Sequence, residues 1–146
     1  MRLPLHVDYA LRMLMQLGVQ DQRLTTIAQT ANTYGISKNH LMKVAHNLRQ
    51  LGYVEAIRGR SGGLKLAMPA EDINIGRFVR DMEAGSALVE CFPGGSGGCL
   101  ITPSCRLKGM LANAMEAFYE SLGQFTLADL INSNAPLREA LLLDVK

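Results

Sequence analysis

Cysteine is scarce in this chain of 146 residues: there are three, and all lie in one short segment, at Cys91, Cys99 and Cys105. Long apolar runs are absent, and no stretch approaches the roughly 18 residues that a membrane span requires. The N-terminus lacks the apolar core of a signal peptide. We therefore expect a cytoplasmic protein with no membrane partner. In that reducing compartment, clustered thiols favour metal binding or redox sensing over structural disulfides.

The sequence also lacks a recognisable catalytic constellation. It has no evident pairing of a nucleophile with a base, no glycine-rich phosphate loop and no paired carboxylates in an apolar setting. Acids of the C-terminal half, such as Glu116 and Glu120, are typical of a solvated helix face. We predict that the protein is not an enzyme.

The net charge of +2 conceals two unlike halves. Residues 1–67 carry nine Lys or Arg and three Asp or Glu, a net charge of +6, whereas residues 68–146 carry six and ten, a net charge of −4. This asymmetry indicates a polyanionic partner for the first half only. An ordinary solvated charge distribution is the alternative.

The basic half has the periodicity of a helix–turn–helix. Apolar residues recur at helical spacing over residues 5–18, and Gly18 is expected to end that helix. A short, threonine-capped helix is expected at 27–31. A glycine turn then leads to a third helix, with Ser37 as N-cap and an apolar stripe that ends at Leu51. This layout is typical of DNA-binding proteins.

A basic hairpin follows the third helix. Residues 54–57 and 64–67 both have the pattern of strands, and a glycine-rich turn at 58–63 joins them. Arg58 and Arg60 stand at the tip of this turn. A basic hairpin directly after a helix–turn–helix is a wing.

The acidic half is predicted to form helices on either side of the cysteine loop. We expect them near residues 76–84, 104–122 and 127–131. The apolar stripe of the long helix mixes steps of three and four, which is typical of a helix that pairs with another helix. We therefore predict a dimerisation helix, with packing on its own domain as the alternative. The stripe consists of Leu107, Leu111, Ala114, Phe118 and Leu122.

Together these patterns predict a mainly α fold with a small β wing. The expected architecture is a winged helix–turn–helix with a long C-terminal dimerisation helix. Its domains are a DNA-binding domain at 1–68, a connecting helix and cysteine-bearing cluster loop at 69–103, and the dimerisation helix with a short C-terminal helix at 104–146.

The first turns of the third helix and the tip of the wing carry the predicted contacts to double-stranded DNA. Asn can pair with adenine through two hydrogen bonds, and Lys can reach guanine or phosphate. Wing arginines would lie in the minor groove or on phosphates. A solvated polar face is the alternative. The predicted DNA-binding residues are Ser37, Lys38, Asn39, His40, Lys43, Arg58, Arg60 and Ser61.

Three cysteines in one Gly/Pro loop indicate a shared partner. An odd number cannot all pair as intramolecular disulfides. Three thiolates that converge from a loop suit an iron–sulfur cluster or, as the next choice, zinc. A redox thiol switch is a third explanation for the cluster of thiols, and inert surface thiols are a fourth.

The fourth ligand of such a centre is not obvious. Lys108 cannot ligate while protonated, and no His lies in or after the cysteine loop. Asp8 on the first helix is a candidate. Its alternative role is an ordinary ion pair with Arg12, one helical turn away.

Several stretches together resemble one family, and they cover nearly the whole chain. They are residues 8–12, 34–41, 52–54, 58–63, 88–91, 99–108 and 125–130. On these residues the chain is identified as a member of the Rrf-type winged-helix iron–sulfur transcriptional regulators. Within that family it is most similar to the repressors that sense nitric oxide.

The resemblance implies a homodimer on a two-fold operator, with one cluster per subunit held by Cys91, Cys99 and Cys105. It favours 4Fe–4S over 2Fe–2S, and it implies that Asp8 of the partner subunit supplies the fourth ligand. It also implies a repressor that releases its operator when nitric oxide nitrosylates the cluster. One departure is the spacing between the first two cysteines, which is longer than the family pattern.

Two further functions stay open. A regulator of the same fold could sense cluster supply or redox state, although the relative that regulates cluster assembly carries a His where this chain has Lys108. From a different class, a small iron–sulfur electron carrier would also use the cysteines, but it would have no use for the basic wing.

Overall fold

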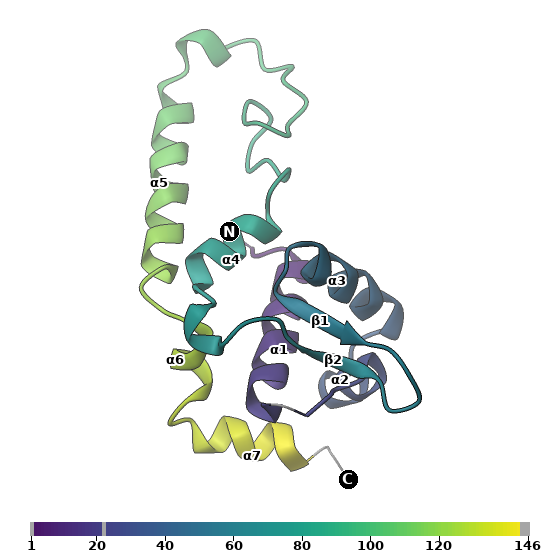
Figure 1. The fold of residues 1–146 in the computed structure, drawn as a ribbon. Helices are drawn as coiled ribbons and strands as arrows, with labels where there is room; N and C mark the ends of the chain where they lie inside the picture. The colour runs from purple at the N-terminus through teal and green to yellow at the C-terminus, as the bar shows by residue number, and fades with distance from the viewer. Residues whose placement is uncertain (1, 22, 144–146) are drawn as a thin grey trace.

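A two-stranded hairpin lies at one side of a mainly helical molecule in the computed structural model, which describes residues 2–21 and 23–143 (Figure 1). This confirms a mainly α fold with a small β wing. The elements are α1 (Leu5–Gln20), α2 (Ile27–Tyr34), α3 (Lys38–Gln50), β1 (Val54–Ile57), β2 (Gly63–Leu66), the 3₁₀ turn η1 (Ala70–Asp72), α4 (Ile75–Met82), the 3₁₀ turn η2 (Thr102–Ser104), α5 (Arg106–Leu122), α6 (Leu127–Ile131) and α7 (Ala135–Leu143).

Helix α1 is the centre of the molecule, and it packs on α3, β2, α6 and α7. The prediction that Gly18 ends this helix was wrong, because α1 continues to Gln20. Gly18 has a packing role instead. A Cβ at that position would lie 2.7 Å from Cδ1 of Ile131 in α6, so the missing side chain is what allows α6 to approach α1 closely.

The first helix of the helix–turn–helix, α2, starts at its predicted threonine cap but continues to Tyr34, three residues beyond its predicted end. Thr26 and Gln29 make a reciprocal capping box at the start of α2. The backbone amide of Gln29 donates to Thr26 Oγ1 at 3.1 Å, and the backbone amide of Thr26 donates to Gln29 Oε1 at 2.7 Å. The helix ends at Gly35, whose φ of 63° is the left-handed conformation that glycine adopts readily.

Helix α3 follows Ser37, which takes the N-cap backbone position without a side-chain capping bond. Its apolar stripe is shorter than predicted. The buried residues end at Leu48, and Leu51 is 38% exposed because it lies at the C-cap, where the chain leaves the helix.

The wing is an antiparallel hairpin in which Val54 pairs with Leu66 and Ile57 pairs with Gly63. Its second strand begins and ends one residue earlier than predicted. A backbone bridge from Leu64 to Thr25 attaches this strand to the segment that leads into α2. The wing and the helix–turn–helix are therefore one packed unit.

Helices α4 and α5 pack on each other, and α5 then extends away from the body of the molecule beside the long cysteine loop (Figure 1). Helix α5 starts at Arg106, two residues later than predicted, after the 3₁₀ turn that contains Pro103. Tyr119 is its buried residue. Met115, Phe118 and Leu122 pack partly buried against the core, so the second half of α5 is held by this chain and its first half is mainly exposed.

The chain returns to α1 at its end. Helix α6 begins at Thr126, and Asp129 completes a reciprocal capping box with that residue. A further helix, α7, was not predicted. Two residues in the sequence mark the start of this helix. They are Asn134, whose side chain accepts a hydrogen bond from the backbone amide of Leu137, and Pro136 in the first turn. The carbonyl of Leu141 accepts a hydrogen bond from the Gln20 side chain, which links α7 to α1.

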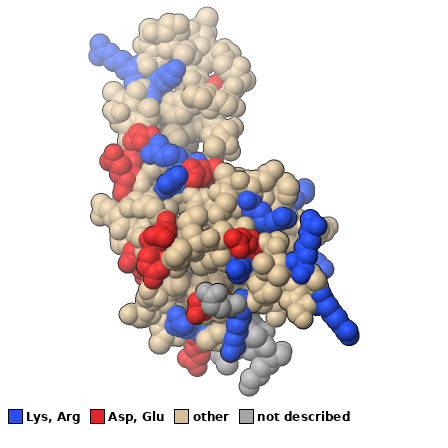
Figure 2. All heavy atoms as spheres, in the orientation of Figure 1, with Lys and Arg blue, Asp and Glu red and all other residues tan. Residues whose placement is uncertain are grey.

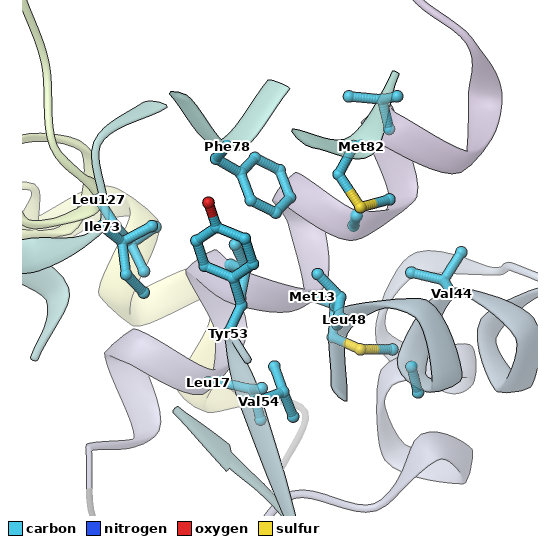
Figure 3. Packing of buried hydrophobic residues seen from close by; sticks show 14 of the residues in the cluster. Met13, Leu17, Val44, Leu48, Tyr53, Val54, Ile73, Phe78, Met82 and Leu127 are labelled. Atoms are coloured by element: carbon cyan, nitrogen blue, oxygen red, sulfur yellow. The ribbon is translucent and has the colours of Figure 1, made fainter. Parts of the chain in front are cut away.

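One continuous apolar core connects these elements (Figure 3). Met13 and Leu17 of α1 lie at its centre, with Leu48 of α3 on one side and Phe78 of α4 on another. The winged helix–turn–helix, α4 and the C-terminal helices therefore share a single core.

Candidate nucleic-acid interface and cysteine loop

The start of α3 presents polar side chains to solvent while its opposite face is buried in the core. Ser37 and the four predicted contact residues of the helix are all exposed: Lys38, Asn39, His40 and Lys43. The ring of His40 lies beside that of Tyr9 from α1, with the centroids 6.3 Å apart. This exposed surface is the part of a helix–turn–helix that can enter the major groove.

The wing tip is held by glycines in a conformation that keeps its basic side chains outside. Gly59 has a φ of 124°, and the amide of Gly62 donates to its carbonyl at 3.1 Å. Arg58, Arg60 and Ser61 are all exposed. Figure 2 shows mainly Lys and Arg along the side of the molecule that carries α3 and the wing, whereas Asp and Glu lie among further Lys and Arg over α4, α5 and α6.

The structure also adds residues that the sequence patterns did not indicate. A hollow of about 300 Å³ lies between α2, the wing and Lys38, and the first turn of α2 forms one wall of it, at Thr26, Ile27 and Ala28. The capping box at Thr26 was the available signal, because the first helix of this motif crosses the DNA backbone. Met42 is a second addition: it is 52% exposed on α3 and can meet the methyl group of thymine.

The three cysteines lie in the loop between α4 and α5, at the end of the molecule away from the wing (Figure 1). Each is partly buried and each is a free thiol. Over residues 2–21 and 23–143, no three His, Cys, Asp or Glu residues are grouped so that they could hold a metal ion. The structure therefore does not bring the thiols and Asp8 together as a ligand set.

The loop is nevertheless ordered around Glu90, the residue before Cys91. Ser96 Oγ donates to Glu90 Oε1 at 2.6 Å, and the amide of Gly97 donates to the Glu90 carbonyl at 3.1 Å. A Cβ at Gly98 would lie 2.8 Å from Glu90 Oε1. The long spacing between the first two cysteines is thus a turn folded back on Glu90.

Asp8 lies at the first turn of α1 and forms the ordinary ion pair that was the alternative to ligation. Its Oδ2 is 2.9 Å from Arg12 Nη2, and its Oδ1 accepts from Arg12 Nε at 3.2 Å. Both side chains are partly exposed, at 35% for Asp8 and 41% for Arg12. A surface pair of this kind is worth less than about 1 kcal/mol.

Polar contacts hold α5 against α4 below the cysteine loop. The Arg80 guanidinium donates twice to the Glu116 carboxylate, at 2.8 and 2.7 Å, and these hydrogen bonds lower the pKa of Glu116. Burial, together with donation to Glu83, raises the pKa of Tyr119 to about 12. The Tyr119 hydroxyl therefore stays protonated, and the bond to Glu83 persists at neutral pH.

A separate cavity of about 520 Å³ lies between the end of α1, β2, α6 and α7. Its lining includes the cations Lys65 and Arg138 and the acids Asp21 and Glu71. None of its lining residues belongs to α3 or to the cysteine loop.

The fold and the exposed basic face define a winged-helix DNA-binding regulator, and comparison with known proteins gives its family. The sequence model described as "Rrf2: Iron-dependent Transcriptional regulator" matches residues 4–133. The chain belongs to this Rrf2 family.

Two sequence relatives match almost end to end. The HTH-type transcriptional regulator NsrR of Bacillus subtilis is 46% identical over 142 residues, which are 97% of each chain. The protein of the same name from Shouchella clausii is 44% identical over 142 residues, 97% of this chain and 95% of that one. The protein is therefore a transcriptional regulator similar to NsrR.

Solved structures agree on the fold. The oxidised form of Staphylococcus aureus CymR has a TM-score of 0.70 at 23% identity, with coverage of 90% of this chain and 97% of that one. T. potens IscR has a TM-score of 0.70 at 22% identity, with coverage of 90% and 86%. In the part of this chain that the structure describes, no helix is long and apolar enough to cross a membrane.

Proposed function

We propose that this regulator is a repressor that senses nitric oxide through an iron–sulfur cluster and releases its operator when the cluster is nitrosylated. The observation that carries the proposal is the combination of two surfaces in one chain. A basic winged helix–turn–helix lies at one end, and a loop that contains every thiol of the protein lies at the other.

The DNA-binding part of the proposal rests on the exposed residues of α3 and the wing. Asn39 and Lys43 would reach base edges in the major groove from the first turns of α3. Arg58 and Arg60 would lie on phosphates or in the minor groove, with Ser61 beside them. The first turn of α2 would face the DNA backbone.

The dimer rests on the exposed apolar side of α5. Leu107 is 57% exposed and Met110 is 64% exposed, while Phe118 and Leu122 are partly buried. A helix with an uncovered apolar stripe is stabilised by a second helix. We propose that α5 packs on α5 of a second copy, so that two α3 helices face a two-fold symmetric operator.

The donor set of the loop fits an iron–sulfur cluster. Thiolates are the ligands that such clusters prefer, and Cys91, Cys99 and Cys105 are free and partly buried on a loop with glycines. We propose these three as ligands of a cluster, with 4Fe–4S favoured, and Asp8 of the partner subunit as the fourth. The cluster would supply the iron that reacts with nitric oxide.

The role of the protein is then to convert a change at the cysteines into a change at the recognition helix α3. The loop holds the thiolates, and the carboxylate of Asp8 ties the loop of one subunit to α1 of the other. Because α1 packs on α3, release of Asp8 would shift the recognition helix relative to its two-fold mate. The proposed setting is the cytoplasm, where the thiols remain reduced.

Measurements on anaerobically purified protein test the DNA-binding part and the cluster part of this proposal. Selection from a random duplex library should return a site with two-fold symmetry. Analysis of iron and sulfide should give one cluster per subunit, and Ala in place of any one of the three cysteines should remove the visible absorbance. Protein that carries zinc, or that selects no DNA sequence, would contradict the proposal.

A further inference from the structure

Tyr53 lies at the junction between the recognition helix and the wing. Its amide donates to the Leu48 carbonyl in the last turns of α3, and its carbonyl accepts from Ala67 just after β2, at 2.9 and 3.0 Å. The side chain is only 6% exposed. A displacement of this one residue therefore moves the end of α3 and the base of the wing together.

The side chain of Tyr53 is bound to α4. Its hydroxyl donates to Asp81 Oδ2 at 2.6 Å, and its ring stands edge-on to that of Phe78 with the centroids 5.0 Å apart (Figure 3). A second contact from α3 lies close by, where Asn47 Nδ2 is 3.6 Å from Met82 Sδ. The DNA-binding elements are thus attached to the last turn of α4.

The same turn of α4 is attached to α5 by a different set of residues. Arg80 makes its two hydrogen bonds to Glu116 and lies over the ring of Tyr119, 4.5 Å from its centroid. The Tyr119 hydroxyl donates to Glu83 at 2.9 Å. Arg80 and the C-cap residue Glu83 therefore bind α5, whereas Asp81 and Met82 between them bind the DNA-binding unit.

The cysteine loop begins and ends on this α4–α5 pair. Helix α4 ends at Met82, and the loop that carries Cys91 follows it. At the other end, Cys105 is the N-cap residue of α5. A rearrangement of the loop that changes how α4 meets α5 must therefore act on the turn that holds Tyr53.

We propose that Tyr53 and Asp81 are positioning residues that transmit the state of the cysteine loop to the wing and α3 within one subunit. This inference rests on the proposed function, and it adds a route separate from the Asp8 bond between subunits. The Tyr53–Asp81 hydrogen bond would form in the cluster-loaded protein and break in the cluster-free protein.

The chemistry of the pair suits this role. A buried hydroxyl that donates to a carboxylate makes a strong, charge-assisted hydrogen bond whose length and direction are narrowly defined. Burial, reinforced by the bond to Asp81, raises the pKa of Tyr53, so that it remains a donor at neutral pH. The contact can therefore be broken by movement of α4 without a change in protonation.

The test measures, for each protein, the operator affinity of the cluster-loaded form divided by that of the cluster-free form. This ratio is compared between wild-type protein, Tyr53→Phe and Tyr34→Phe. Tyr34 is a matched control, because its half-buried hydroxyl donates to the Arg12 carbonyl at 3.0 Å, on α1 and not on α4. Wild-type protein and Tyr34→Phe should have the same ratio. Tyr53→Phe should reduce it about tenfold, the effect of one hydrogen bond to a charged group.

Rescue and hydrogen exchange separate positioning from a loss of stability. Asp81→Asn retains an oxygen that accepts from Tyr53 and should keep most of the ratio, whereas Asp81→Ala should match Tyr53→Phe. Exchange of amides at residues 53–66 should rise when wild-type protein loses its cluster, and in Tyr53→Phe it should be high in both states.

The outcomes distinguish this inference from the function on which it rests. A wild-type ratio near one would contradict the proposed function, and the relay with it. A large wild-type ratio that Tyr53→Phe leaves unchanged would overturn the relay alone. A ratio lowered equally by Tyr53→Phe and Tyr34→Phe would also overturn it, because general destabilisation would then explain the effect.

Discussion

Asp8 and Arg12 are joined one turn apart on α1, with both carboxylate oxygens within hydrogen-bonding distance of the guanidinium, at 2.9 and 3.2 Å. The carboxylate proposed as a cluster ligand for the partner subunit is therefore paired within its own chain. The pair is partly exposed and weak, so that it can be exchanged for a stronger ligand at little cost.

Replacement of each member of this pair separates the two roles of Asp8. We expect Asp8→Ala to lose cluster stability and to bind the operator more weakly even before nitric oxide is added, because a ligand is missing. Arg12→Ala breaks the same ion pair but leaves the carboxylate in place, so that it should keep its cluster. The measurements are iron content and operator affinity under anaerobic conditions. Equal behaviour of the two variants would exclude ligation by Asp8.

Operator binding should weaken steeply with salt. If a dimer neutralises about six phosphates, the slope of log affinity against log salt should be about −5. Arg60→Ala should weaken binding to all sequences and make the slope shallower, whereas Asn39→Ala should also relax sequence preference. Titrations of selected and scrambled duplexes at several salt concentrations measure both effects. An affinity that does not change with salt would rule out this interface.

The Glu90 turn should govern how firmly the loop retains its cluster. Glu90→Ala and Ser96→Ala each remove the 2.6 Å hydrogen bond that folds the segment between Cys91 and Cys99. We expect both variants to lose iron to a chelator several-fold faster than the wild type. Glu120→Ala removes an exposed acid from α5 and serves as the control. Wild-type rates in both loop variants would show that the turn has no such role.

Replacement by alanine should change the free energy of unfolding in opposite directions at two glycines, one on α4 and one on α5. At Gly76 a Cβ would collide with the backbone of Tyr119 and Gly123, which cannot give way, so we expect a loss of about 1–3 kcal/mol or more in the free energy of unfolding. Gly109 has open space around it and faces away from the α5 stripe, so Gly109→Ala should stabilise by about 0.5–1 kcal/mol. Denaturant unfolding of the two variants measures this, and a neutral Gly76→Ala would contradict the close α4–α5 contact.

Much of the fold could be predicted because its signals are local. A threonine cap identified the start of α2, and periodicity gave most of the buried face of α3. Gly18 was misjudged because the same residue type either ends a helix or allows close packing, and only the position of Ile131 distinguishes the two. Helix α7 was missed although Asn134 and Pro136 signal its first turn.

The site was predictable as a set of residues but not as a set of contacts. Exposure of the start of α3 and of the wing follows from their polarity and position in the motif. The Tyr53–Asp81 and Arg80–Glu116 contacts join residues far apart in the chain, and periodicity indicates only which face a residue occupies. A ligand from a second subunit, as proposed for Asp8, cannot be inferred from the spacing of residues in one chain.

The proposed signal is nitric oxide, which would act on the proposed cluster of this chain and so release DNA. A titration of anaerobic, cluster-loaded protein on a labelled operator duplex tests this, with visible absorbance and fluorescence anisotropy recorded in the same sample. We expect both signals to fall together as nitric oxide is added, and Cys99→Ala to show neither change. Operator binding that persists after the cluster absorbance has been lost would contradict the proposal.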